Sequence, residues 1–422
     1  MFEFLVKKFA KPRKPVICER AQHCISRKNI DPDALKVLYR LSKLGYTAYL
    51  VGGGVRDLLL GRKPKDFDVG TNATPKEVKR AFCNCFLIGR RFRLAHIKYG
   101  QNIIETATFR KNSQTVGEII EHAAEGPFDD NTWGTPETDA FRRDFTINGL
   151  FYDINTFAVI DYVGGLDDLK SHLIRSIGDP MIRFREDPVR MMRAIRFACK
   201  LGFEVEKGTW KAMLRLHGCI LSASVPRLCE EVYRFFGLGA SEMAFRMAWK
   251  CGMLGDLLPE LAAFIDMDGR NSSEVWKYLR ALDEFEKSDR VQRGPEFNAV
   301  RSAVLLLPLA RATTPVDAMK MMQRQLKIPK VSYFEALSLL ESAKTFARMP
   351  GKNAKRYLGR RDTALYMIFN EIAAKAEGRG NDAVAEAWRS LASKSSDSGT
   401  NDAVRPPKLP RRRNNHEQEN QN

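Results

Sequence analysis

Hydrophobic and polar residues follow two different patterns along the 422-residue chain. The first part holds short apolar runs rich in β-branched and aromatic side chains, ending with Phe157–Tyr162 before Gly164 and Gly165, and such runs are typical of strands. Further on, the apolar residues recur at helical spacing. The clearest predicted helices are Val225–Phe236, Ser241–Leu258, Ser273–Phe285 and Val331–Phe346. This pattern predicts an α+β fold, in which a small mixed sheet precedes an elongated helical remainder.

A turn of three glycines interrupts the predicted sheet. Tyr46–Val51 favours a strand, Val55–Leu60 favours a short helix ended by Gly61, and Gly52, Gly53 and Gly54 lie between them. Glycines at a strand-to-helix turn let the backbone approach a polyanion closely, and the free N–H groups at the helix start point toward it. The turn therefore predicts a phosphate-binding site.

Two aspartates follow this turn. Asp66 and Asp68 are separated by one residue, so in a strand they share one face while Phe67 and Val69 turn toward the core. Divalent cations relieve the repulsion between such carboxylates, and two Mg²⁺ ions about 3.5–4 Å apart are the usual means of displacing pyrophosphate from a nucleotide. The aspartates alone would favour a solvated acidic turn, because the motif is short, but the preceding glycine turn reverses this preference and favours a metal site.

A third feature is the sequence Asp187-Pro188. It reads as an N-cap followed by proline at the first helical position, which predicts a helix to about Lys200. Met192, Ile195 and Cys199 then form an apolar stripe, and Arg190 lies on another, basic face. A charged, solvated helix face is the alternative interpretation.

Four motifs occur in order, at Gly52–Asp57, Asp66–Asp68, Arg142–Asn148 and Glu186–Arg190. Together they resemble the class II nucleotidyltransferases of the polymerase beta superfamily, which contain the bacterial poly(A) polymerases and the tRNA CCA-adding enzymes. The resemblance covers about residues 46–258. Residues 87–97 are similar to the segment that marks poly(A) polymerases, and this favours polyadenylation.

The resemblance implies roles for individual residues. Asp66 and Asp68 are expected to be catalytic and to hold Mg²⁺, and Asp144 is expected to be the third catalytic acid. Glu105, in the predicted strand Ile103–Phe109, competes with Asp144 for that place. The expected nucleotide-binding residues are Gly52, Gly53, Arg56, Arg142, Arg143, Asp187 and Arg190.

Two of these expectations concern nucleotide contacts. Arg142 and Arg143 would grip the triphosphate or orient the base through forked hydrogen bonds, although a surface salt bridge is the alternative. Asp187 and Arg190 correspond to the acid and arginine that read the edge of the incoming base in the resembled family. A carboxylate accepts and an arginine donates, so such a pair can distinguish adenine from other bases.

Composition agrees with a protein that handles nucleic acid, because 69 Lys and Arg against 51 Asp and Glu leave a formal charge of +18. The longest apolar runs, such as residues 303–310, are too short to span a bilayer, and no signal peptide is expected, so we expect a cytoplasmic protein. The 8 cysteines lack the paired spacing of a zinc site.

The predicted function is template-independent polyadenylation, in which a polynucleotide adenylyltransferase transfers AMP from ATP to RNA 3′ ends, releases pyrophosphate and tags RNA for processing or decay. RNA-decay proteins are further expected partners. The alternatives are a CCA-adding enzyme and a non-catalytic RNA-binding protein. We expect five regions: a basic N-terminal extension (1–44), the catalytic domain (45–170), a helical neck that binds nucleotide and RNA (171–260), a helical RNA-binding region (261–394) and a disordered basic tail (395–422).

Overall fold

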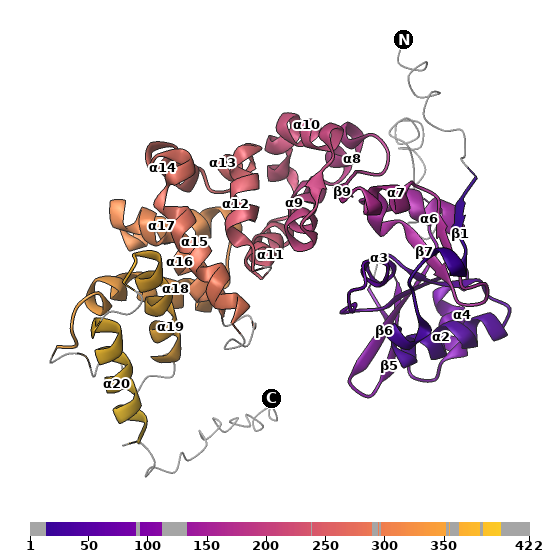
Figure 1. The fold of residues 1–422 in the computed structure, drawn as a ribbon, viewed down its shortest axis with the longest axis horizontal. Coiled ribbons are helices and arrows are strands. Elements are labelled where there is room, and N and C mark those ends of the chain that lie inside the picture. Colours follow the sequence, from indigo (N-terminus) through magenta and orange to yellow (C-terminus); the bar gives the residue numbers. More distant parts are fainter. Residues whose placement is uncertain are drawn as a thin grey trace, which may run out of the picture.

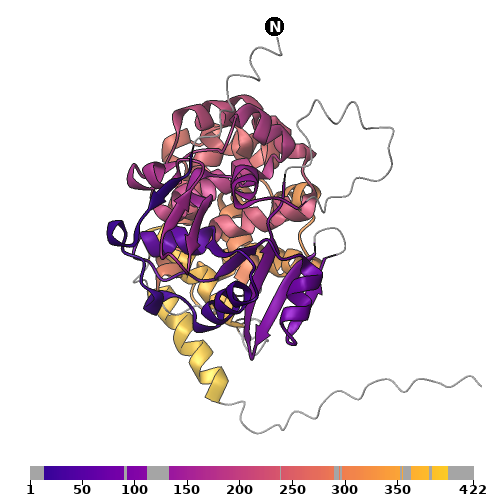
Figure 2. The same cartoon turned by 90° about the vertical axis from the view of Figure 1, so that its right-hand side faces the viewer.

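The computed structural model describes residues 14–89, 93–111, 133–237, 239–288, 294, 297–351, 354, 363–379 and 383–397. It confirms the predicted α+β fold. A head that contains the main sheet is followed by a neck and then by an arm of packed helices, so the molecule is elongated (Figure 1). Viewed along the long direction, the head and the arm lie one behind the other (Figure 2).

The head is built on an eight-stranded mixed sheet with the strand order β1-β8-β7-β2-β3-β6-β5-β4. Neighbouring strands are antiparallel except for β3 and β6, which are parallel. The bounds are β1 Val16–Cys18, β2 Ala48–Val51, β3 Asp68–Thr71, β4 Cys85–Ile88, β5 Leu94–Tyr99, β6 Asn102–Thr108, β7 Leu150–Asp153 and β8 Val159–Asp161. Only Asp68 of the two predicted metal ligands belongs to a strand, because β3 begins there.

Helices α2 (Pro32–Lys43) and α4 (Pro75–Ala81) pack on one face of this sheet. The side chain of Asp31 caps α2, and the buried stripe Ala34, Val37, Leu38 and Leu41 faces the strands. Strand β1 pairs with β8 at the sheet edge. The described residues before 45 are therefore part of the head and not a separate extension, since they supply an edge strand and a core helix; residues 1–13 lie outside the described chain.

Shorter elements complete the head and connect it to the neck. They are the helices α3 Gly53–Leu59, α6 Pro136–Arg142 and α7 Gly165–Lys170, and the 3₁₀ helices η1 Arg20–Gln22, η2 Arg27–Asn29 and η3 Thr146–Asn148. In the neck, β9 (Leu173–Ile174) pairs with β10 (Glu204–Val205), and α8 (Pro180–Glu186) precedes α9 (Val189–Leu201).

Helix α9 begins one residue later than predicted. Pro188, with helical φ and ψ, is its N-cap, while Asp187 is extended and its Oδ1 accepts from the backbone N–H of Val189 at 3.3 Å, as a capping side chain does. The helix ends at Gly202, whose φ of 73° suits glycine. The predicted stripe is confirmed, since Met192, Ile195 and Cys199 are buried.

The helices that follow β10 lead from the neck into the arm, and the spacing of apolar residues predicted several of them well. Predicted Ser241–Leu258 is two helices, because Gly252 adopts a φ of 89° between them. The bounds are α10 Lys207–Leu216, η4 His217–Ser222, α11 Val225–Phe236, α12 Ser241–Lys250, α13 Met253–Leu257, α14 Pro259–Met267, η5 Arg270–Ser272, α15 Glu274–Lys287, α16 Asn298–Ala312, α17 Pro315–Leu326, α18 Lys330–Phe346, α19 Thr363–Ala376 and α20 Ala383–Asp397.

Two predictions concern the far end and the membrane. Helix α20 reaches Asp397, so it includes the first residues of the predicted tail, while the remainder, 398–422, lies outside the described residues. The apolar run at residues 303–310 forms the buried centre of α16. None of the helices in the described part of the chain combines the length and apolar character needed to cross a bilayer.

Candidate active site

A cavity of about 450 Å³ lies where the head meets the neck. Its walls come from the glycine turn, the start of β3, the segment from α6 to η3, and the helices α8, α9 and α11. The volume is within the range of small-molecule sites. The lining residues are Gly52, Gly53, Arg56, Asp68, Arg142, Arg143, Asp144, Asn148, Asp187, Arg190, Arg193, Phe197 and Arg227.

The glycine turn is required by its neighbours. Gly52 has a φ of 70°, which disfavours other residues, and a Cβ atom there would lie 2.8 Å from Nη1 of Arg143. Gly53 begins α3, and β2 next to the turn pairs Val51 with Asp68. This register places the turn beside the predicted metal ligand.

Arg56 is predicted to bind nucleotide but is itself 2% exposed. Its Nη1 donates to Oδ1 of Asn148 at 2.6 Å, and its Nε donates to Oδ1 of Asp57 at 2.8 Å. These bonds tie α3 to η3. Arg56 therefore shapes the cavity wall while its guanidinium is occupied by protein partners.

Asp68 carries the strongest electrostatic signal of the site. Burial raises the pKa of its carboxyl to about 6, and the nearby charges of Glu105 and Asp66 add to the rise while Arg143 opposes it. The ionised carboxylate thus lacks a sufficient positive partner, which a divalent cation would supply. Asp66 is exposed just before the strand.

Glu105 and Asp144, the two candidates for a third acid, lie in different environments. Glu105 is on β6 beside β3 and acts on Asp68 electrostatically. Asp144 accepts from Nε of Arg193 at 2.7 Å, from Nδ2 of Asn148 at 3.0 Å and from its neighbour's backbone. Burial raises the pKa of Asp144, but the charge of Arg193 and these hydrogen bonds outweigh burial and hold it below its usual value.

Asp139 is a residue that the sequence reasoning missed. It is 3% exposed and accepts from Nε of Arg142 at 2.8 Å and from Nε and Nη2 of Arg143 at 3.1 and 2.9 Å. Burial raises the pKa of Asp139, but the two arginines outweigh burial and lower it overall. The i, i+3 and i+4 spacing on a helix could have revealed this arrangement.

Arg183 was missed as well, and it joins the neck to the same segment. Its Nη2 donates to the backbone carbonyls of Arg142 and Arg143, both at 2.8 Å, and its Nη1 donates to Glu186 at 2.7 Å. Nothing in its local sequence indicated this role, because its partners lie 40 and 41 residues away. Arg183 therefore fixes the backbone that presents the two cavity arginines.

Asp187 and Arg190 both line the cavity, but their side chains have different partners. Nη1 and Nη2 of Arg227 donate to the two oxygens of Asp187 at 3.0 and 2.8 Å. Arg190 donates to Oε2 of Glu186 at 3.1 Å and to the carbonyl of Arg183 at 3.0 Å. Arg227, on α11, was not foreseen.

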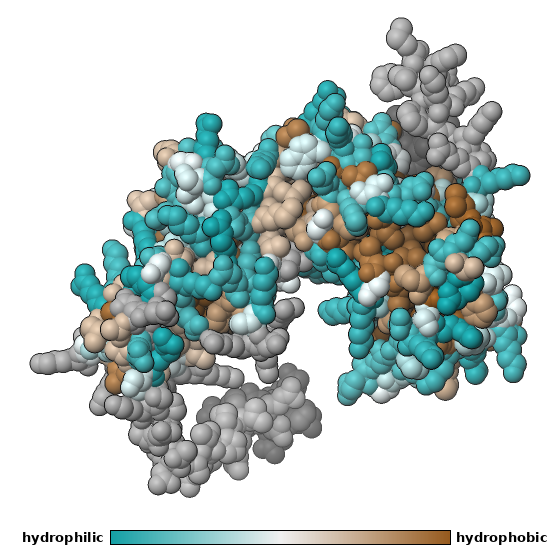
Figure 3. Space-filling view, in the orientation of Figure 1, coloured by the Kyte–Doolittle hydropathy of each residue, from teal (hydrophilic) through white to brown (hydrophobic). Residues whose placement is uncertain are grey.

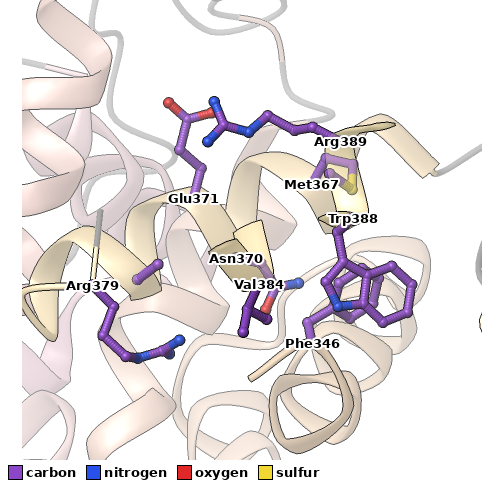
Figure 4. Close-up of a pocket in the computed structure, with 9 residues that line it drawn as sticks. Phe346, Met367, Asn370, Glu371, Arg379, Val384, Trp388 and Arg389 are labelled. Atoms are coloured by element: carbon purple, nitrogen blue, oxygen red, sulfur yellow. The ribbon is translucent and has the colours of Figure 1, made fainter. Parts of the chain in front are cut away.

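Three observations bear on other sites. Among the described residues, no three acidic, histidine or cysteine side chains are grouped to hold a metal ion by themselves. A second cavity, of about 70 Å³, lies at the far end of the arm, where Phe346 and Trp388 pack near Met367 (Figure 4). It is small and lies far along the arm from Asp68. A third cavity, of about 460 Å³, lies in the head between residues 28–32 and 61–67. The cavity between head and neck is the candidate active site, because most of the predicted site residues line it.

Fold and site together define a nucleotidyltransferase head. Residues 48–175 match the family of the poly A polymerase head domain, and residues 202–265 match the family described as "Probable RNA and SrmB- binding site of polymerase A". Residues 48–175 thus belong to the poly A polymerase head-domain family, which confirms the resemblance seen in the sequence.

Similarity to individual proteins points to the same family. The chain is 47% identical over 271 residues to an Escherichia coli poly(A) polymerase I, covering 63% of this chain and 58% of the relative. For a Haemophilus influenzae poly(A) polymerase I the identity is 39% over 287 residues, with 67% and 63% covered. The chain thus spans less than two thirds of the length of these relatives. The crystal structure of a Bacillus stearothermophilus CCA-adding enzyme in complex with CTP matches with a TM-score of 0.64 and 25% identity, over 87% of this chain and 83% of that one.

Proposed function

We propose that this protein transfers AMP from ATP to the 3′-hydroxyl of RNA and releases pyrophosphate. The observation that carries the proposal is the cavity at the head, which gathers Asp68, the glycine turn and six arginines at the junction of head and neck. A triphosphate needs this combination of acidic metal ligands and cationic side chains. The identity to poly(A) polymerases supports adenylate as the transferred group.

Asp66 and Asp68 would hold the divalent metal, for which we propose Mg²⁺. The residues fit such an ion, because partial burial, and after it the like charge of Glu105, raises the pKa of the half-buried Asp68 carboxyl, and a cation would stabilise its ionised form. Mg²⁺ commonly uses one or two carboxylates together with substrate phosphates and water, so two aspartates are sufficient protein ligands. When bound, the metal lowers the pKa of the attacking hydroxyl and neutralises charge on the leaving pyrophosphate.

For the third acid we propose Glu105 in place of Asp144. Glu105 is the acid on the neighbouring strand whose charge reaches Asp68, and its side chain is 50% exposed and open to ligand. Asp144 instead forms an ion pair with Arg193, in which Oδ2 of Asp144 lies 2.5 Å from Nη2 of Arg193. We assign Asp144 the role of fixing Arg193 at the cavity wall.

Arg142 and Arg143 would bind the triphosphate opposite the glycine turn. Arg143 supports this role because its Nη1 lies 2.8 Å from the position that a Cβ of residue 52 would take, so the guanidinium lies directly against the turn. Asp139 neutralises part of each arginine's charge and fixes both side chains. Gly52 and Gly53 would let the phosphates approach the backbone closely.

Asp187 and Arg190 would contact the base from the neck side of the cavity. Arg227 holds both oxygens of Asp187, which limits the rotation of that carboxylate. A fixed acceptor rejects a base whose donors are misplaced, because buried polar groups would be left unpaired. We propose that Arg227, by holding the Asp187 carboxylate in place, enables Asp187 to select the base of the incoming nucleotide.

RNA is the proposed acceptor, and RNA-decay proteins are the proposed partners. The net charge of +18 supports a polyanionic substrate, and the space-filling view shows the molecule hollowed between head and arm, with hydrophilic residues along the margins (Figure 3). We further propose that the reaction takes place in the cytoplasm and tags RNA for processing or decay.

An extension assay tests the proposal. A labelled generic RNA and a tRNA without its CCA end are incubated with Mg²⁺ and either ATP alone or ATP plus CTP, beside the double variant Asp66→Ala/Asp68→Ala. We expect a long ladder on generic RNA with ATP alone, absent in the double variant. RNA binding without extension under any condition would contradict the proposal and indicate a binding protein.

CCA addition is the second candidate, and the similarity to the CTP-bound CCA-adding enzyme favours it. In that case the same assay would show a stop after three nucleotides on tRNA and a requirement for CTP. The two enzymes therefore differ in the length of the product and not in the presence of activity.

A further inference from the structure

In the described part of the chain, one face of strands β4, β5 and β6 is open beside Asp68. Helices α2 and α4 cover the opposite face, where α2 contacts β3 and β6 and α4 contacts β4 and β5, and Figure 1 draws both helices on the side of β5 and β6 that is away from the arm. On the open face, large apolar side chains are exposed: 58% of Phe86, 50% of Ile88 and 47% of Ile103. Their exposure beside a candidate active site requires an explanation.

Strand register aligns this face with the site. Phe86 on β4 is opposite His96 on β5, and His96 is opposite Glu105 on β6. Val69 pairs with Thr106. Asp68 and Glu105 each precede one member of this pair, so they are neighbours on the face opposite to Val69 and Thr106, which is the open face. Directly opposite residues share a face of a sheet. A row of side chains therefore runs from Asp68 to the sheet edge at Phe86.

The chemistry of the open sheet face, defined here as Phe86, Ile88, Ile103 and Lys98, suits single-stranded nucleic acid. Lys98 on β5 is exposed and is opposite Ile103. Lys79 reaches the sheet edge from α4 on the covered side, where it donates to the carbonyl of Cys85 and lies 5.4 Å from the centre of the Phe86 ring. Bases stack on aromatic rings while lysines contact phosphates. Glu105 lies on the same side of the sheet as Asp68, and Nε2 of His96 is 3.7 Å from it.

We propose that the open sheet face binds the single-stranded 3′ segment of the RNA substrate and that Phe86 stacks on one of its bases. This inference rests on the proposed function, because it places the acceptor beside Asp68. Three strand spacings separate Asp68 from Phe86, or about 14 Å. At about 3.4 Å for each stacked nucleotide, Phe86 meets the base about four positions from the 3′ end.

Binding of a fluorescein-labelled oligoadenylate, measured by anisotropy without ATP or metal, tests this site. We expect Phe86→Ala to weaken binding about 5- to 30-fold, the usual effect of removing one stacking partner, and Phe86→Trp to restore it. Tyr39→Ala is the matched control, since Tyr39 is an aromatic residue, 42% exposed, on α2, which covers the opposite face of the sheet. We expect that control to bind as the wild type does. Circular dichroism checks that each variant is folded.

Oligoadenylates with one abasic position sharpen the test, because they keep every phosphate and lose one base. In the wild-type protein, we expect one position near the fourth from the 3′ end to weaken binding most. In Phe86→Ala, that position should have no further effect, because its stacking partner is already gone. Unchanged RNA binding by Phe86→Ala, or an equal abasic effect in both proteins, would overturn the proposal and leave a protein partner as the occupant of this face.

The test of this RNA-binding site can fail or succeed independently of the test of the proposed function. If the wild type binds oligoadenylate through Phe86 but transfers no AMP, the site stands and the proposed function fails. If Phe86→Ala extends RNA with an unchanged KM for RNA, the proposed function stands and this site is wrong.

Discussion

Arg227 holds Asp187 by two parallel hydrogen bonds of 3.0 and 2.8 Å, although 40 residues separate them in the chain. Such a forked pair adds geometric specificity to the charge interaction, so it fixes the position of the carboxylate. Asp187 ends α8, and Arg227 lies in the first turn of α11, so the pair also joins two helices of the cavity wall.

Arg227→Ala should relax nucleotide selection, because the Asp187 carboxylate would then keep only the longer hydrogen bond from the backbone N–H of Val189, at 3.3 Å. We expect kcat/KM for ATP to fall about 10-fold and the preference for ATP over CTP to shrink, which corresponds to the loss of one charged hydrogen-bonding partner. Steady-state kinetics with all four nucleotides measure this. Arg215→Ala, an exposed arginine of α10, is the control. An unchanged nucleotide preference in Arg227→Ala would show that Arg227 has no part in selection.

Asp139→Asn should weaken ATP binding, because Arg142 and Arg143 lose the carboxylate that orients both. We expect KM for ATP to rise about 10-fold and the free energy of unfolding to fall by about 2 kcal/mol, the scale of hydrogen bonds to a charged group. Kinetics and urea unfolding measure the two effects. Glu137→Gln removes an acid from the same helix and should change neither. A normal KM in Asp139→Asn would mean that the arginines need no orientation.

Glu105→Gln should lower the pKa of Asp68 below about 6, because a like charge that raises this pKa is removed. Carboxyl NMR titration without metal measures the shift. We also expect kcat to fall about 100-fold, comparable to the loss of a charge that stabilises the transition state. Glu137→Gln again serves as the control. If the pKa of Asp68 is unchanged in Glu105→Gln, the electrostatic link between the two residues is absent.

Asp144 should make stability depend on pH in the acid range. Its pKa is lowered in the folded protein, so its contribution is present above the unfolded value, near 3.8, and is lost as pH falls through the lower folded value. Urea unfolding of the wild type and of Asp144→Asn from pH 7 to pH 3 measures this. We expect the difference in unfolding free energy to be constant above about pH 5 and to shrink below pH 4. A difference that does not change with pH would refute the stabilisation of ionised Asp144 by Arg193.

The amino-acid sequence by itself determined the local features of this protein. Helix α11 has the bounds that apolar spacing predicted, and Gly52 lies at a turn of positive φ between strand and helix. The stripe Met192, Ile195 and Cys199 is buried as expected. These features follow from interactions between residues a few positions apart, and such interactions are visible in sequence spacing.

The tertiary structure alone decided which side chains meet. Asp144 pairs with Arg193, 49 residues away, and the register of β6 on β3 brings Glu105 to Asp68. Spacing carries no information about either contact, because each depends on how the neck packs on the head or how strands align. Charges can be read from the sequence, but their partners are chosen by packing.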